Sequence, residues 1–193
     1  MIVGVLAFQG DFAEHVHILH RLHVPSLEVR TKDDLSKIDA LIIPGGESTV
    51  IAQFLGSSGV GREIQRRLKD TKHPLAVYGT CAGAIVLARR ATGKNAPRTL
   101  GLIDITVDRN AYGTQIESFE TVISVRGIKE PLSVAFIRAP KITRIGQAVQ
   151  VLAEDQGLPV LVRQGSVLVG TFHPEVRAET AIHRYFMDAV VGW

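Results

Sequence analysis

Short and largely apolar runs, separated by helical patterns, constrain the fold of this chain most strongly. Ile2–Phe8, Asp39–Ile43 and Leu75–Tyr78 are such runs, and polar residues do not alternate with their apolar ones. This pattern is typical of strands that are buried on both faces of a sheet. The segments between them predict one further strand, Leu27–Arg30, and the helices Phe12–His23, Ser48–Leu55, Arg62–Lys69 and Ala82–Arg90. Alternating strands and helices predict an α/β fold with a mostly parallel sheet.

The pattern changes after Gly101, where strand-like segments follow one another with few helices between them. The predicted strands here are Ile103–Val107, Ile116–Val125, Ser133–Ile137, Ala148–Ala153, Pro159–Arg163 and Val167–Phe172. A last helix is expected at Glu179–Val191, and Gly93–Pro97 reads as a surface loop. Nothing requires a second domain, so we expect residues 1–193 to form one domain in which the later, antiparallel strands extend the same sheet.

Composition narrows the class of protein. The 193 residues are 46% hydrophobic and 21% charged, as in ordinary soluble domains, which excludes an intrinsically disordered chain. The net charge of +3 is scattered rather than clustered, so no nucleic-acid-binding stripe is predicted. A single cysteine rules out an intramolecular disulfide and fits a reducing compartment. The apolar N-terminus reads as a strand rather than a signal peptide, and we expect a cytoplasmic protein without a membrane span.

The segment Tyr78-Gly79-Thr80-Cys81-Ala82-Gly83 passes from strand to helix without a spacer. Strand, Gly-x-Cys-x-Gly and helix form the cysteine version of the nucleophile elbow, a turn that admits only small neighbours. It places Cys81 at the carboxyl end of a strand and at a helix N-terminus, which favours a thiolate. A lone cysteine is ordinarily a small buried hydrophobe. The two glycines and the strand–helix context favour a nucleophile instead.

A thiol nucleophile needs a base, and His173 is the best candidate among the seven histidines. It follows an apolar strand and opens His173-Pro174-Glu175. In extended backbone, residues two apart point the same way, so Glu175 is expected to orient the imidazole. A strand-end histidine beside a solvated glutamate is the alternative, and the cysteine elbow favours the catalytic pair.

Acyl transfer also needs hydrogen-bond donors for the oxyanion. The backbone N–H of Ala82 is one candidate, and the second is the glycine pair of Pro44-Gly45-Gly46-Glu47-Ser48, where the main chain can approach a substrate closely. A plain turn with Ser48 as helix N-cap would explain the same residues, and both interpretations can hold.

The six other histidines have weaker claims. His17 is one helical turn from His20, and His20 is one turn from His23, but no carboxylate or cysteine completes a metal-ligand set. With His15 they fit a solvated or partly packed helix face, and no metal is expected.

Together, these segments resemble class I glutamine amidotransferases, most closely the branch formed by the glutaminase subunits of pyridoxal 5′-phosphate synthases. The resemblance runs nearly end to end, through Leu6–Gly10 with Glu14-His15, Pro44–Thr49, Gly79–Gly83, Arg109–Gly113, Ser118-Phe119, Phe136–Pro140 and His173–Glu175. Most other class I glutaminases have glutamine two residues after the second glycine of the elbow, and this chain has Ile85 at that position. The difference argues against the histidine, purine and anthranilate branches. Thr114 departs from the arginine expected in this branch.

The resemblance implies a flavodoxin-like three-layer α/β/α fold and hydrolysis of L-glutamine to L-glutamate and ammonia. Cys81 would be the nucleophile, His173 the base and Glu175 its orienter, with no cofactor. Gly46, Glu47, Ser48, Arg109, Ile137 and Arg138 would line the glutamine site, and Arg109 or Arg138 would pair with the substrate carboxylate. The ammonia would pass, within a hetero-oligomer, to a synthase subunit that makes pyridoxal 5′-phosphate from a pentose phosphate and a triose phosphate.

Two other classes of function stay open at this point. A cysteine-elbow protein of the chaperone or glyoxalase type shares the sheet and the elbow, but does not need Pro44–Ser48 or His173–Glu175. A binding module that has lost catalysis would be expected to lack Cys81, His173 or Glu175, and all three are present.

Overall fold

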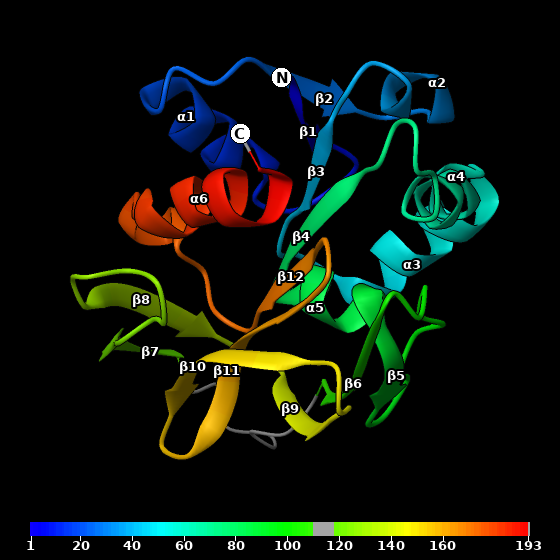
Figure 1. Ribbon diagram of the computed structural model, residues 1–193. Coiled ribbons are helices and arrows are strands. Elements are labelled where there is room, and N and C mark those ends of the chain that lie inside the picture. The colour runs from blue at the N-terminus through cyan, green and yellow to red at the C-terminus, as the bar shows by residue number, and fades with distance from the viewer. Residues whose placement is uncertain (110–117, 193) are drawn as a thin grey trace.

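A seven-stranded sheet forms the centre of the protein in the computed structural model, which describes residues 1–109 and 118–192 (Figure 1). Its strands, in spatial order, are β10 (Gln150–Asp155), β11 (Leu158–Gln164), β12 (Val167–Gly170), β4 (Ala76–Thr80), β3 (Ala40–Ile43), β1 (Val3–Leu6) and β2 (Ser26–Val29). The five strands from β12 to β2 pair in parallel, whereas β11 pairs antiparallel with both of its neighbours, β12 and β10. Every residue of β1, β3, β4 and β12 is buried, as their continuous apolar runs predict.

Helices cover both faces of this sheet and create two separate cores (Figure 1). One face carries α1 (Phe12–Arg21), α6 (Ala181–Tyr185) and the π-helix η2 (Phe186–Val191) that continues α6. The other carries α2 (Lys32–Leu35), α3 (Ser48–Ser57), α4 (Val60–Arg67) and α5 (Ala82–Leu87). The predicted α/β class, with a mostly parallel sheet and antiparallel strands in the C-terminal half, is confirmed.

The prediction that all later strands extend one sheet is wrong. Only β10, β11 and β12 do so, while the others form two smaller sheets. These are the three-stranded sheet of β5 (Ala88–Thr92), β6 (Ile103–Asp108) and β9 (Lys141–Ile145), and the hairpin of β7 (Ser118–Ile123) and β8 (Leu132–Ile137). Burial alternates along β6, so this strand has one core face and one wetter face and does not need a place inside the central sheet.

Several element boundaries also differ from the predicted ones. The helix expected at Ala82–Arg90 ends at Leu87, and the chain continues as β5, where the exposed Arg89 pairs with Asp104 at 3.1 Å. The last helix begins at Ala181. The helix α2, with a capping box between Thr31 and Asp34, was not predicted, nor was β9. Residues 116–117 of the strand expected at Ile116–Val125 lie outside the described residues.

The parallel pairing has one consequence for function. β1, β3, β4 and β12 all end at the same edge, so the segments that follow them meet there. Within the described part of the chain, no helix is long and apolar enough to span a membrane.

Candidate active site

Cys81 lies directly after β4, at the tip of a tight turn into α5. Its backbone has φ 47° and ψ −101°, a strained conformation for a residue with a side chain. The neighbouring strand holds the turn, because the Cys81 N–H donates to the Gly170 carbonyl at 2.9 Å. Cys81 is 8% exposed, and its Sγ lies 3.8 Å from the carbonyl oxygen of Ile137. The structure thus has the strand–elbow–helix geometry that the sequence predicts.

The elbow requires glycine at positions 79 and 83, because neighbouring atoms leave no space for a side chain there. A Cβ on Gly83 would overlap the carbonyl oxygen of Ile43 on β3, and one on Gly79 would lie 2.8 Å from the Gly83 backbone. Backbone atoms cannot yield as a flexible side chain can, so any larger residue would displace α5 from β4. The elbow therefore fixes the position of Cys81 relative to the sheet.

His173 follows β12 and lies 4% exposed at the same edge. Its backbone N–H donates to the Ala135 carbonyl at 2.8 Å, which ties it to β8. Its Nδ1 lies 2.7 Å from Oε1 of Glu175, which is itself buried. The structure thus brings together the two residues that the sequence pairs.

The reason given for that pairing was wrong. Pro174 has φ −70° and ψ −28°, which is helical rather than extended, and Glu175 begins a short 3₁₀ helix, η1 (Glu175–Arg177). The carboxylate therefore reaches the imidazole across a tight turn, where Pro174 favours the helical backbone. Spacing along an extended strand does not explain this contact.

The electrostatics of the pair favour a charged histidine. Burial by itself lowers the pKa of His173, but hydrogen bonds to Cys81 and Glu175 outweigh it and raise the pKa to about 10. Burial raises the pKa of Glu175, and its hydrogen bond to His173 opposes that effect. At neutral pH, His173 accordingly holds its proton between the thiol and the carboxylate.

The glycine pair after β3 packs against this histidine. A Cβ on Gly45 would lie 3.1 Å from Nδ1 of His173 and closer still to its Cε1. A Cβ on Gly10 would overlap the Gly45 carbonyl oxygen, so that carbonyl points at Gly10, and the N–H of Gly46 points the opposite way across the trans peptide. Gly46 itself has φ 139°. Together with the Ala82 N–H at the start of α5, this peptide is the second candidate donor to an oxyanion.

Glu47 and Arg109 form an ion pair beside the glycine pair. Nη2 of Arg109 lies 2.8 Å from Oε1 of Glu47, and its Nη1 donates to the Thr49 hydroxyl and the Asn95 carbonyl at 3.0 and 2.6 Å. Burial alone raises the pKa of Glu47, but the Thr49 N–H and Arg109 outweigh it and lower the pKa. Glu47, rather than Ser48, is the N-cap of α3.

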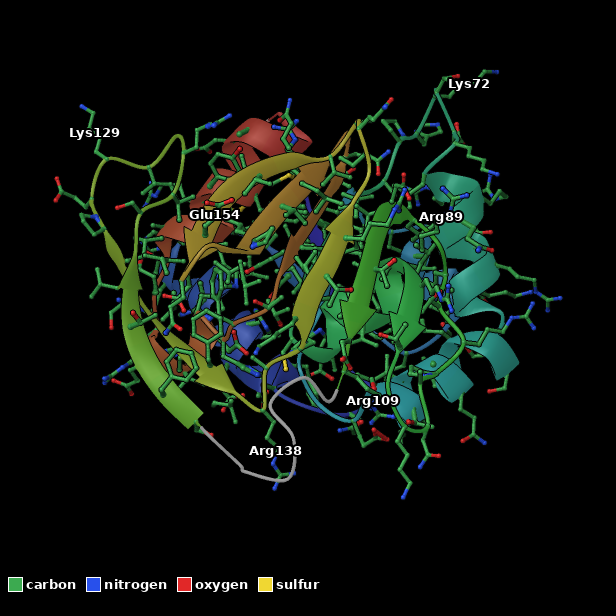
Figure 2. The ribbon with its side chains drawn as sticks, turned by 90° about the horizontal axis from the view of Figure 1, so that it is seen from below. Lys72, Arg89, Arg109, Lys129, Arg138 and Glu154 are labelled. Atoms are coloured by element: carbon green, nitrogen blue, oxygen red, sulfur yellow. The ribbon has the colours of Figure 1, made fainter. Side chains whose placement is uncertain are left out.

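The remaining predicted glutamine-site residues differ in exposure. Ser48 is buried, and its hydroxyl has no hydrogen-bond partner among the described residues. Ile137 ends β8, and the exposed Arg138 follows it with φ 46°. Figure 2 shows Arg109 and Arg138 at the same side of the molecule. Residues 110–117, including Thr114 and most of the Arg109–Gly113 motif, lie outside the described residues.

Sequence reasoning gave no role to three residues that the structure places here. Asp11, the N-cap of α1, has Oδ2 3.5 Å from Nδ1 of His173. Gln9 accepts a hydrogen bond from the Glu47 N–H at 3.2 Å. His15, one turn into α1, is fully buried with Nε2 3.6 Å from Glu175. All three follow β1, so their signal was a strand that ends at the same edge as β3, β4 and β12.

One group of metal-ligand type exists among residues 1–109 and 118–192, and it is Asp11, His173 and Glu175. Since Nδ1 of His173 is already bonded to Glu175, a cation there would have to break the pair. The sequence-based expectation of no metal stays a prediction.

This fold, with a cysteine elbow facing a histidine–glutamate pair, defines the class of glutamine amidotransferases. The structure superposes on a solved "glutamine amidotransferase" with a TM-score of 0.92 at 46% identity, and 100% of each chain is covered. A model of the SNO glutamine amidotransferase family matches residues 5–192, and the chain belongs to that family.

Curated relatives match this chain over nearly its whole length. The chain is 44% identical to the pyridoxal 5′-phosphate synthase subunit PdxT of Thermotoga neapolitana, over 98% of this chain and all of that one. It is 48% identical to PdxT of Thermus thermophilus, over 97% of this chain and 96% of that one. A more distant structure, PurLQS of Thermotoga maritima, has a TM-score of 0.71 at 15% identity, covers 97% of each chain, and shows the fold alone. Membership of this family argues against the alternative of a cysteine-elbow protein of the chaperone or glyoxalase type.

Proposed function

We propose that the chain hydrolyses L-glutamine to L-glutamate and ammonia, with Cys81 as nucleophile, His173 as acid and base, and Glu175 as the residue that orients His173. The observation that carries the proposal is the meeting of the elbow thiol with the buried His173–Glu175 pair. A thiol nucleophile with an oriented histidine is the arrangement that acyl transfer requires.

The reaction follows from these positions. The thiolate of Cys81 attacks the side-chain amide carbon of glutamine, and the amide oxygen becomes an oxyanion that accepts hydrogen bonds from the Ala82 and Gly46 N–H groups. His173 gives its proton to the leaving nitrogen, ammonia departs, and a γ-glutamyl thioester remains. His173 then takes a proton from water, which attacks the thioester and releases glutamate and the thiol.

We expect Arg109 and Arg138 to have different roles in binding glutamine, because their surroundings in the structure differ. Arg109 is engaged by Glu47, Thr49 and Asn95, whereas the exposed Arg138 follows Ile137, whose carbonyl is 3.8 Å from the nucleophile. We assign the α-carboxylate of glutamine to Arg138, because a guanidinium matches a carboxylate as a fork. Arg109 then holds Glu47, with Ser48 and Gly46, at the other side of the site.

The proposal also includes a partner that receives the ammonia. The relatives PdxT are named as subunits of pyridoxal 5′-phosphate synthase, so we propose that a cytoplasmic synthase subunit docks here and receives the ammonia. Exposed apolar residues at this edge, Phe8 and Val50, suit a partner surface.

The test is glutamate release by the purified chain, alone and with a molar excess of the synthase subunit. We expect Cys81→Ser to abolish the reaction and His173→Ala to slow it by about 10²–10⁴-fold. The Gly45–Gly46 peptide can reorient at little steric cost, so docking is expected to raise the rate. Full activity in Cys81→Ser would refute the mechanism, and no activity in the complex would refute the function.

A further inference from the structure

Two fully buried histidines, His15 and His183, form a second pair next to Glu175 and are separate from the His173–Glu175 pair. Nδ1 of His15 on α1 lies 2.8 Å from Nε2 of His183 on α6. Nε2 of His15 lies 3.3 Å from the hydroxyl of Thr80 and 3.6 Å from Oε2 of Glu175. That Oε2 is buried and has no hydrogen-bond partner among the described residues. The imidazole of His15 is therefore placed to serve this oxygen.

Hydrogen-bond direction in this chain of groups follows from the donors available. A neutral imidazole has one N–H, so His15 can donate from Nδ1 or from Nε2, but not from both. Donation from Nδ1 to His183 would leave the Nε2 lone pair facing a carboxylate oxygen without a donor, at 3.6 Å in a dry interior. Donation from Nε2 avoids this, and His183 then donates its own Nε2 hydrogen to His15.

Burial also decides the charge of the two rings. Burial, followed by the neighbouring His183 and His173, lowers the pKa of His15 well below its usual value. Burial lowers the pKa of His183 to about 4, and a backbone hydrogen bond to Glu179 acts in the opposite direction. Both rings are therefore neutral when the site works near neutral pH.

We propose that His15, held by His183, is a positioning residue that directs its Nε2–H toward Oε2 of Glu175 and so holds the carboxylate that aligns His173. This inference rests on the proposed glutaminase function and concerns residues that touch neither substrate nor the reacting atoms. Glu175 thereby has both oxygens held, Oε1 by His173 and Oε2 by His15.

The other groups that face Glu175 do not replace this contact. Tyr78 of β4 has a buried hydroxyl without a partner in the described residues, and its pKa is raised well above the usual value by burial and by Glu175. Asp11 faces His173 and repels the carboxylate. The hydroxyl of Thr80 lies 3.3 Å from Nε2 of His15 and can accept from the same N–H.

A matched pair of variants separates this role from packing. In His15→Gln the side-chain amide nitrogen can occupy the place of Nε2, whereas in His15→Asn it can occupy only that of Nδ1. With the synthase subunit present, we expect His15→Asn to lower kcat about 10-fold with little change in KM, and His15→Gln to stay within about threefold of wild type. Loss of the donor also favours protonation of Glu175, so the acid limb of kcat/KM should move to higher pH by about one unit in His15→Asn.

The controls make each outcome decisive. His20→Asn, an exposed position on the same helix, should match wild type in both kcat and pH profile. Equal loss in the Gln and Asn variants, or an acid limb that stays in place, would overturn the proposal. Nitrogen-15 NMR of the histidine rings gives a readout independent of activity, and a proton on Nδ1 of His15 would also refute it. A wild-type complex that releases no glutamate would instead refute the proposed function.

Discussion

Replacing Gly45 by alanine should damage catalysis through one added methyl group. Its backbone is not in the left-handed region, so alanine is tolerated there, but the new Cβ meets Cε1 and Nδ1 of His173 and lies 3.0 Å from Oδ2 of Asp11. The contact with Cε1 is roughly 1 Å closer than ordinary van der Waals contact, and a shift of that size in a reacting group costs on the order of 10² in rate. We expect kcat of Gly45→Ala in the synthase complex to fall about 100-fold.

The measurement is steady-state glutamate release at saturating glutamine, with thermal unfolding recorded on the same samples. Gly56→Ala is the matched control, because the same substitution there meets nothing within 4 Å and lies inside α3. That variant should keep wild-type activity and gain about 0.5–1 kcal/mol of stability. Activity of Gly45→Ala within threefold of wild type would show that His173 moves freely and would refute the steric argument.

Three further results are expected. Arg109→Ala frees Glu47 and should raise KM for glutamine about 10-fold, since hydrogen bonds to charged groups are worth about 1.5–3 kcal/mol, while Arg144→Ala, which removes an exposed ion pair with Asp104, should leave KM unchanged. The free energy of unfolding should fall as the pH drops from about 6.5 through about 4, because unfolded His183 binds a proton that the buried ring resists; the contribution is at most about 3 kcal/mol, and a slope as steep in His183→Gln would contradict it. Treatment with a chelator should leave glutamate release unchanged, and a loss that zinc restores would mean that Asp11, His173 and Glu175 hold a working metal.

The central sheet could be predicted because its strands carry their own signal. β1, β3, β4 and β12 are buried on both faces, so their sequences are continuously apolar and bounded by glycine, proline or polar residues. β5 carries no such signal, since its two arginines are exposed and an apolar helix leads straight into it. Which strands share a sheet depends on long-range packing, and local periodicity does not contain that information.

Local motifs predicted which residues form the candidate site, but they did not predict the buried side chains packed next to it. The glycines around Cys81 identify the elbow because the backbone of β3 leaves no space for a side chain. His15 was assigned to a solvated or partly packed helix face and His183 was given no role, although both are fully buried. They lie 168 residues apart, so only the folded chain shows that they form one hydrogen bond.

The two halves of the candidate catalytic machinery therefore have different kinds of support. Cys81 is fixed by backbone contacts inside the sheet, through Gly83 against β3 and the hydrogen bond to Gly170 of β12. Glu175 lies on a short 3₁₀ turn and depends on side chains from α1 and α6 on one face of the sheet. Because that face and the elbow's face have separate cores, loosening α6 should affect proton transfer while the nucleophile keeps its place.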